Sequence, residues 1–247
     1  MTREREVERA RPRHDTRQTE TMREIGRFRL INLEHLAAHR YDGRESDMRE
    51  DLANLRSLVE TRTVIDRKAN RTIEVAVLTA KGKSVLKSDH REQSFYNGQA
   101  LFDRLVRPRE VFHDAMIYLA YQDAAKRLEA KGATVDRIVL DHELKGLKAR
   151  ETNKPRPWRK ENGPLTRTEQ DAIARGLQLK VINGKVHIPD LRIEYTDKDG
   201  ETKILDLEIT TSSYRGAAKA AKTAAGFALC SGSGAGSPVW DDHHLWR

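Results

Sequence analysis

The sequence predicts an α/β (α+β) chain of two domains: a helical N-terminal domain with one β-hairpin, and a C-terminal mixed sheet flanked by helices. Apolar residues recur at three- and four-residue steps over residues 21–40 and 46–59, and the run 73–77 then alternates strictly. Farther on, two strand-like runs within residues 188–210 flank a turn that contains Asp199-Gly200, a hairpin marker. A helical domain with a hairpin therefore precedes a second, sheet-based domain.

The order of elements follows from local signals. Residues 21–40 predict one or two helices, which end at the break Tyr41-Asp42-Gly43. Ser46 is the expected N-cap of a second helix, which runs to Val59. A charged turn at 66–71 then joins the two arms of the hairpin.

Composition sets the expected domain boundaries. Arg and Glu dominate residues 1–20, which lack the apolar side chains needed to offset the entropy of ordering. The run Ser231–Ser237 has the composition of a flexible linker. The expected parts are a disordered charged arm (1–20), a helix-and-hairpin domain (21–90), a connector with a long helix (91–132), a sheet domain (133–230) and a flexible tail (231–247).

The charge of the chain points to a polyanionic partner. Forty-six Lys and Arg face 38 Asp and Glu, which gives a net charge of +8 and a pI near 9.6. This balance favours nucleic acid as the partner. The alternative is that the chain, like many soluble proteins, is mildly basic for no specific reason. No apolar run is long enough for a membrane span, and the N-terminus is charged where a signal peptide would need an apolar region. Cys230 has no second cysteine to pair with. A cytoplasmic protein that binds no membrane is expected.

Two acidic residues carry the strongest chemical signal. If the strands pair symmetrically about the turn, facing residue numbers sum to about 397, and Asp190 lies opposite Glu208 or one step away. Neighbouring carboxylates repel each other, and a divalent cation such as Mg²⁺ (or Mn²⁺) relieves that repulsion. The alternative is a pair of solvated carboxylates on an exposed face of the hairpin.

Pro189-Asp190 on one strand and Glu208 on the next resemble the PD-(D/E)XK nuclease superfamily. The resemblance implies a restriction-endonuclease-like mixed sheet, in which the Asp and the Glu hold metal ions that activate water for attack on a phosphodiester. Thr210 stands where the superfamily usually has Lys. A lysine on the following helix, expected over residues 217–229, substitutes in some members, and Lys219 and Lys222 are the candidates here.

The same resemblance implies further site residues. A glutamate is expected on a helix before the first strand, and Glu143 is assigned to it, with Lys145 as an additional cation and Glu169 as the rival. Arg215 stands at the expected start of the Lys-bearing helix, where a phosphate would bind. His113 and Asp114 are either site residues or, as we expect, groups that satisfy the start of the long helix.

The N-terminal order of helix, turn, helix and hairpin resembles a winged helix-turn-helix. In such modules the second helix lies in the major groove and the wing contacts the backbone or the minor groove. Winged helices that only dimerise or dock proteins remain the alternative. The resemblance assigns DNA contacts to two groups of residues: Arg49, Asn54 and Arg56 on the helix, and Arg67, Lys68 and Arg71 on the wing.

A winged helix is followed here by His113-Asp114, Pro189-Asp190, Glu208-x-Thr210 and a Lys-bearing helix. This combination resembles the replication-relaxation type proteins of plasmids and mobile elements. Membership implies DNA processing in replication, mobilisation or transposition, alongside other proteins of the element. Double-strand cleavage favours a homodimer. Three functions stay open: a Mg²⁺-dependent DNA endonuclease, a non-catalytic DNA-binding accessory protein, and a transcriptional regulator.

Overall fold

The computed structural model describes residues 16–66, 70–88, 98–104, 110–154, 165–210, 216–231 and 238–240. Within these ranges the chain is a mixed α/β protein with eight helices and three sheets. None of its helices in this part of the chain combines the length and apolarity that a membrane crossing requires. The N-terminal part contains α1 (Thr16–Arg27), β1 (Ile31–Asn32), α2 (Leu33–Arg40), α3 (Glu45–Asn54), β2 (Val59–Asp66), β3 (Arg71–Leu78) and α4 (Ala80–Ser88).

The predicted hairpin is confirmed. Strands β2 and β3 pair antiparallel from Val59 opposite Leu78 to Asp66 opposite Arg71, and β1 pairs with the other edge of β3. The preceding helix is shorter than expected: α3 begins at Glu45 and ends at Asn54, so Ser46 lies inside it rather than at its N-cap. Val59 instead opens β2, because the β-branched run that follows it pairs along the whole of β3.

The predicted disordered arm is too long at its C-terminal end. Residues 16–20 belong to α1, where Arg17 Nε donates to Asp51 Oδ2 at 2.6 Å and Gln18 Nε2 donates to Asp51 Oδ1 at 3.2 Å. Asp51 is buried, so its carboxylate needs these partners, and they hold the first turn of α1 against α3. The prediction for residues 1–15 lies outside the described residues.

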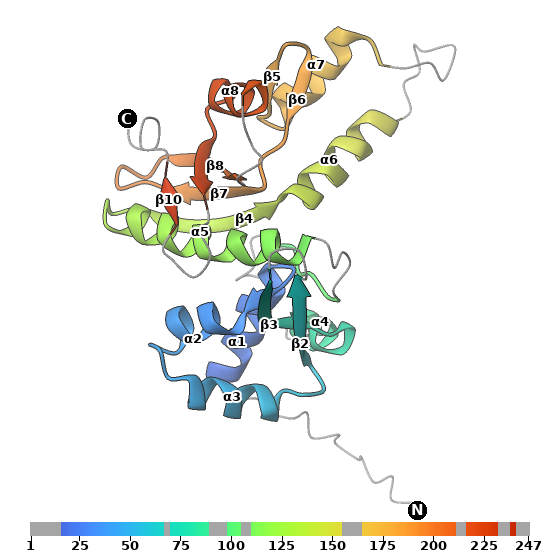
Figure 1. Cartoon of the computed structure of the whole chain (residues 1–247). Coiled ribbons are helices and arrows are strands. Elements are labelled where there is room, and N and C mark those ends of the chain that lie inside the picture. The colour runs from blue at the N-terminus through green and yellow to red at the C-terminus, as the bar shows by residue number, and fades with distance from the viewer. Residues whose placement is uncertain are drawn as a thin grey trace, which may run out of the picture.

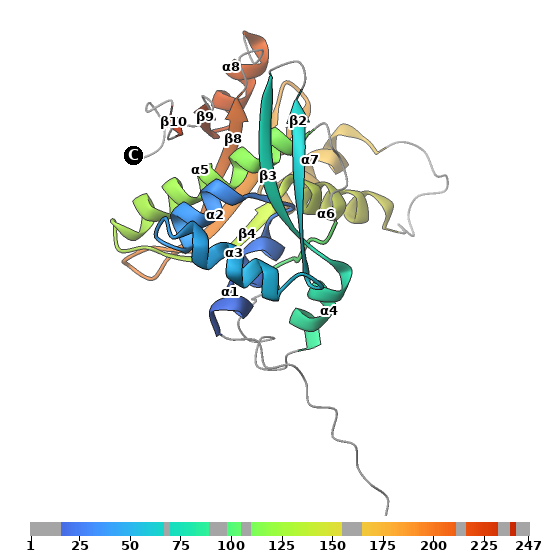
Figure 2. The same cartoon turned by 60° about the horizontal axis from the view of Figure 1, so that its bottom comes forward.

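Helix α5 (Val111–Glu129) lies between the N-terminal elements and the C-terminal sheet (Figures 1 and 2). On one side, Phe28 of the N-terminal part packs edge-on against Tyr118, with 5.1 Å between ring centroids. On the other side α5 packs on β4 and β8, and one hydrophobic cluster joins all three layers. The predicted connector is therefore a shared central layer. It ends as expected before Gly132, whose φ of +80° suits glycine.

The C-terminal sheet is mixed, with strand order β10-β9-β8-β7-β4. Strands β4, β7 and β8 are antiparallel neighbours, whereas β8 and β9 run parallel and are connected through α8. This part comprises β4 (Thr134–Leu140), α6 (Asp141–Asn153), α7 (Arg167–Gly176), β5 (Lys180–Ile182), β6 (Lys185–His187), β7 (Leu191–Thr196), β8 (Thr202–Thr210), α8 (Ala217–Ala224), β9 (Ala228–Ser231) and β10 (Val239–Trp240).

The two faces of this sheet differ. Leu191, Ile193, Leu207 and Ile209 lie in the cluster that α5 shares. Strand alternation turns the residues between them to the opposite face. There, Val139 of β4 packs against α6, α7 and the β5–β6 hairpin, which lie above the sheet in Figure 1. Glu208 of β8 lies on this face and belongs to the candidate site described below.

Two boundaries near the C-terminus differ from the prediction. Helix α8 ends at Ala224 rather than at Leu229, because Gly226 (φ +78°) reverses the chain and the apolar run from Ala228 pairs with β8. The expected flexible tail contains order at three described positions: Ser231 closes β9, and Val239 and Trp240 form β10. Trp240 anchors this strand, since its Nε1 donates to Asp123. Residues 232–237 and 241–247 lie outside the described ranges.

Replacing Gly82 of α4 by alanine is expected to lower the free energy of unfolding by about 1–3 kcal/mol. An added Cβ would lie 2.2 Å from the carbonyl oxygen of Leu58, which also accepts hydrogen bonds from Thr79. The measurement is urea denaturation. The matched control is Gly146→Ala in α6, where an added Cβ has open space; it should stabilise by about 0.5–1 kcal/mol. Equal effects of the two substitutions would contradict the packing of α4.

Candidate active site

The β7–β8 ladder brings the two predicted carboxylates to neighbouring positions. Leu191 pairs with Leu207 and Arg192 with Asp206, so facing numbers sum to 398, and Asp190, just before β7, lies opposite Glu208 or one step away. The backbone N–H of Asp190 donates to Leu207 O at 3.1 Å, which departs by one residue from the register of β7 and β8. The predicted register is thus confirmed.

Lys222 of α8 reaches Glu208. Its Nζ lies 2.8 Å from Glu208 Oε2 and donates to the carbonyl of Ile188 at 2.9 Å. Glu208 is only 5% exposed, so this ion pair lies in a sheltered place under α8. Of the two lysines predicted from the sequence, Lys222 makes this contact, whereas Lys219 lies on the exposed side of the same helix.

Thr210, two residues after Glu208 on β8, binds the neighbouring strand. Its hydroxyl donates to the carbonyl of Cys230 on β9 at 3.2 Å and so links two parallel strands. The cation beside Glu208 therefore comes from α8, twelve positions farther along the chain than Thr210.

Asp190 is held by groups from two other elements. Its Oδ2 accepts the N–H of Ile209 at 2.9 Å and lies 3.2 Å from Nε2 of His113, near the start of α5. His113 Nδ1 lies 3.4 Å from Asp114. Burial disfavours the charged imidazole, but the hydrogen bonds to Asp114 and Asp190 outweigh it and raise the pKa of His113 to about 10. His113 is therefore a cation at neutral pH, and it contacts Asp190 rather than only satisfying the helix start.

More charged groups surround the start of α5. Arg29 from the N-terminal part lies 3.4 Å from Asp114 and 3.5 Å from Glu110, and it also pairs with Asp141. The backbone N–H of Asp141 donates to the carbonyl of Asp190 at 3.1 Å. Lys145 pairs with Asp141 as well, one turn along α6. A network of ion pairs thus lies next to Asp190.

Burial favours the neutral form of Asp141, but the hydrogen bond from Lys145 and the charge of Arg29 lower the pKa of this carboxyl. Asp141 therefore stays ionised beside Asp190. Lys145 donates to Asp141, whereas the cation that contacts Asp190 itself is His113.

The glutamate predicted before the first strand is wrongly assigned. Glu143 lies on α6, which follows β4, and it pairs with Arg137 of β4. Burial raises the pKa of Glu143 in spite of Arg137. Glu169 accepts the N–H of Thr166 at 2.8 Å in the capping box of α7. The helix that precedes β4 is α5, and near its start it bears His113 and Asp114.

Each of the two central carboxylates has a cationic partner. Asp190 contacts His113, and Glu208 contacts Lys222. Across the parts of the chain that the structure describes, no three His, Cys, Asp or Glu side chains gather closely enough to enclose a metal ion. The site is therefore a pair of cation-bound carboxylates at one end of the β7–β8 hairpin.

The predicted DNA contacts do not form one basic face. Arg49 is bound to Glu45 at 2.7 Å and to Glu74 of β3 at 2.9 Å. Helix α3 also carries Asp47, Glu50 and Asp51, so it has more acidic than basic side chains. Asn54 and Arg56 are exposed at its C-terminal end. The guanidinium of Arg71 lies 4.4 Å from the ring centroid of Phe112 on α5. Arg67, Lys68 and Arg215 lie outside the described residues.

The pKa of His113 predicts a pH-dependent contribution to stability. Because the folded pKa of about 10 exceeds the ordinary value of 6.5, the stabilisation is complete below pH 6.5 and is lost as the pH rises toward 10. In chelator-containing buffer, the difference in unfolding free energy between the wild type and His113→Gln should shrink over this interval. Urea denaturation at several pH values measures it, and a pH-independent difference would contradict the assignment.

No protein family, no curated protein and no solved structure matches this chain.

Proposed function

We propose that the chain is a metal-dependent DNA endonuclease, with a winged-helix-like N-terminal part and a restriction-endonuclease-like C-terminal part. The observation that carries the proposal is the contact of Lys222 with Glu208 on β8, next to Asp190 at the start of the paired strand. This set supplies two anionic oxygen donors and one cation, and these are the groups that phosphodiester hydrolysis requires. The resemblance to PD-(D/E)XK nucleases, including members with a relocated lysine, agrees with it.

A divalent cation fits the donor set in chemical type. Mg²⁺ prefers carboxylate oxygens and retains water, and Asp190 and Glu208 would hold it. When bound, such an ion lowers the pKa of water and neutralises charge on the phosphate. Lys222 then stands beside Glu208, where its ammonium can stabilise the negative charge that develops on the phosphate. His113 orients Asp190 through its Nε2 and so acts as a positioning residue.

The N-terminal hairpin supports a shared substrate for both parts. Strands β2 and β3 pack against the start of α5, where Arg71 stacks on Phe112. The next residue, His113, contacts Asp190. A duplex that touches the hairpin therefore passes close to the carboxylates. Within the resemblance to replication-relaxation type proteins, the reaction belongs to DNA processing in a mobile element.

The test is cleavage of supercoiled and linear DNA with Mg²⁺ or Mn²⁺, using the wild type, Asp190→Asn and Glu208→Gln. The proposal expects nicked or linear product from the wild type only, and no product in chelator. Lys198→Ala, in the turn beyond the far ends of β7 and β8, is the control that should cleave normally. Wild-type protein that binds DNA and leaves it intact with both metals would overturn the proposal.

A second candidate function is DNA binding without cleavage. One observation favours it: His113 and Lys222 already neutralise the two carboxylates, and such ion pairs stabilise a fold without any metal. An accessory protein of this kind should bind DNA equally well in Mg²⁺ and in chelator. Asp190→Asn should then change its stability but no catalytic rate.

A further inference from the structure

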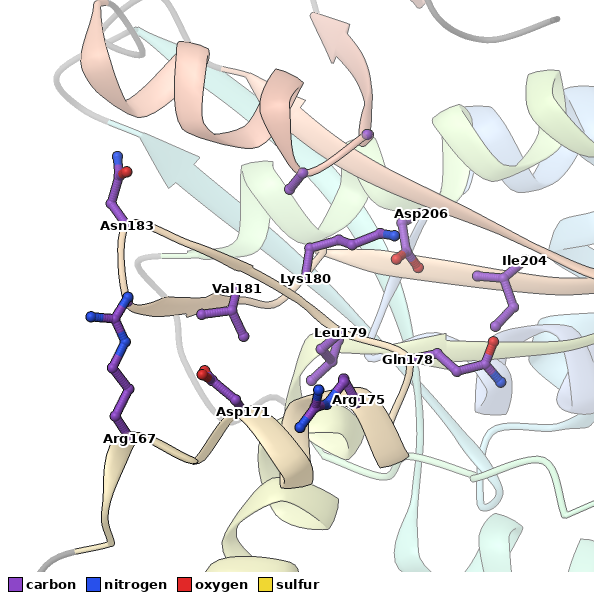
Figure 3. A pocket seen from close by; sticks show the side chains of 13 residues that line it. Arg167, Asp171, Arg175, Gln178, Leu179, Lys180, Val181, Asn183, Ile204 and Asp206 are labelled. Carbon is purple, nitrogen blue, oxygen red and sulfur yellow. The ribbon is translucent and has the colours of Figure 1, made fainter. Parts of the chain in front are cut away.

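We propose that the groove between α7, the β5–β6 hairpin and β8 binds the sugar-phosphate backbone of nucleic acid. Figure 3 shows this groove, which has a volume of about 770 Å³ and is open to solvent. The inference rests on the proposed function for the identity of its ligand, but it concerns a surface that none of the residues discussed above as DNA contacts touches.

Three basic side chains line the groove without acidic partners. Arg167 and Arg175 come from α7 and Lys180 from β5, and all three are exposed. In Figure 3 Lys180 extends across the groove toward Asp206. None of these cations forms an ion pair with an acidic group of the described chain. Surface cations that lack partners and share a groove attract a polyanion, because binding releases the counterions that it carries.

The floor of the groove does not repel an anion. Asp206 lies there, but Arg192 neutralises it with two hydrogen bonds, from Nε to Oδ1 at 2.7 Å and from Nη2 to Oδ2 at 3.0 Å. The remaining carboxylate of the lining is Asp171. The lining of the groove thus carries three cations without acidic partners and one carboxylate outside an ion pair, so its net charge is positive.

Arg192 also sets the shape of the groove. It is 3% exposed, and it donates to the carbonyls of Leu177 and Gln178 at 2.8 and 2.9 Å. Those carbonyls belong to the turn between α7 and β5, so the wall that carries Arg175 and Lys180 is fixed to the sheet. A groove that is organised before binding loses less entropy when a ligand enters.

The groove adjoins the candidate active site along one strand. Asp206 and Glu208 are two residues apart on β8 and share a face, which separates them by ~6.6 Å along the strand. A nucleic-acid strand with one phosphate at Glu208 and Lys222 would therefore continue into the groove. A chain of phosphates suits this continuous surface better than a single anion does.

The experiment is fluorescence anisotropy of labelled 20-nucleotide single strands and duplexes with the full chain, in chelator and over a range of NaCl concentrations. For Arg167→Ala/Arg175→Ala/Lys180→Ala, the slope of log K against log[NaCl] should fall in magnitude by about 2 to 3, with a single-cation variant losing about 0.7–0.9. Asp171→Asn should instead tighten binding. Lys198→Ala, which removes a charge beyond the far ends of β7 and β8, should leave the affinity within about twofold of wild type.

An unchanged slope in the triple variant, with thermal unfolding like that of the wild type, would overturn the groove. Because these titrations contain no divalent cation, they do not depend on hydrolysis. If the triple variant loses binding while the wild type fails to cleave, the result supports nucleic-acid binding in the groove and contradicts the endonuclease activity. If Asp190→Asn abolishes cleavage while the triple variant binds normally, the result supports the endonuclease activity and contradicts nucleic-acid binding in the groove.

Discussion

Arg192→Ala is expected to lower the free energy of unfolding by about 3–5 kcal/mol, the range for removing one partner of a buried ion pair. Arg192 is 3% exposed and forms four hydrogen bonds, two to Asp206 and two to the turn carbonyls of Leu177 and Gln178. Without the guanidinium, Asp206 becomes a sheltered charge that has lost its ion pair. Denaturation in urea measures the loss.

The matched control for Arg192 is Arg62→Ala. Arg62 forms a similar two-bond pair with Glu60, at 2.7 and 3.0 Å, but both side chains are more than two-fifths exposed. Exposed pairs contribute about 0–1 kcal/mol, so this variant should remain near the wild type. If Arg192→Ala also lost less than about 1 kcal/mol, the face of the sheet that carries the groove would not be organised as described.

Lys222→Met is expected to slow DNA cleavage by about 100-fold or more, the usual cost of removing a group that stabilises charge in a transition state. Methionine keeps the length of the side chain and its contact with Phe227 while it removes the ammonium from Glu208. The rate of product formation under single-turnover conditions measures the effect. Anisotropy in chelator shows whether binding is retained.

Lys219→Met is the control on the same helix. Lys219 is exposed, and it was the rival candidate for the relocated lysine. We expect its cleavage rate within about twofold of wild type. If Lys219→Met were slow and Lys222→Met fast, the lysine of the site would be wrongly assigned. A pronounced loss of thermal stability in Lys222→Met alone would instead indicate a structural ion pair with Glu208.

The closeness of Asp190 and Glu208 along the hairpin could be predicted because it depends on local rules. A turn marked by Asp-Gly sets the register of the two strands around it, and the observed sum of 398 lies one unit from the expected 397. The sequence could narrow the choice of the lysine beside Glu208 to Lys219 and Lys222, since both lie on the helix that follows β8. The contact between His113 and Asp190 joins residues 77 positions apart, and no local pattern reports such a contact.

The boundary errors have physical causes. Alanine favours helix, so the Ala-rich run predicted a helix through Leu229, although Gly226 was an available stop signal before a run that pairs with β8. Arg17 belongs to a helix because Asp51, 34 positions away, binds it. Pairing partners outside the local window decided both elements.

The most direct test of the central claim, that Asp190 and Glu208 act as one hydrolytic centre, is a double-mutant comparison of single-turnover cleavage rates. Residues that act as a unit give non-additive losses. We predict that Asp190→Asn and Glu208→Gln each slow cleavage by about 1,000-fold or more, and that the double variant is no slower than the singles. Losses that multiply in the double variant, or wild-type rates in either single variant, would contradict the account.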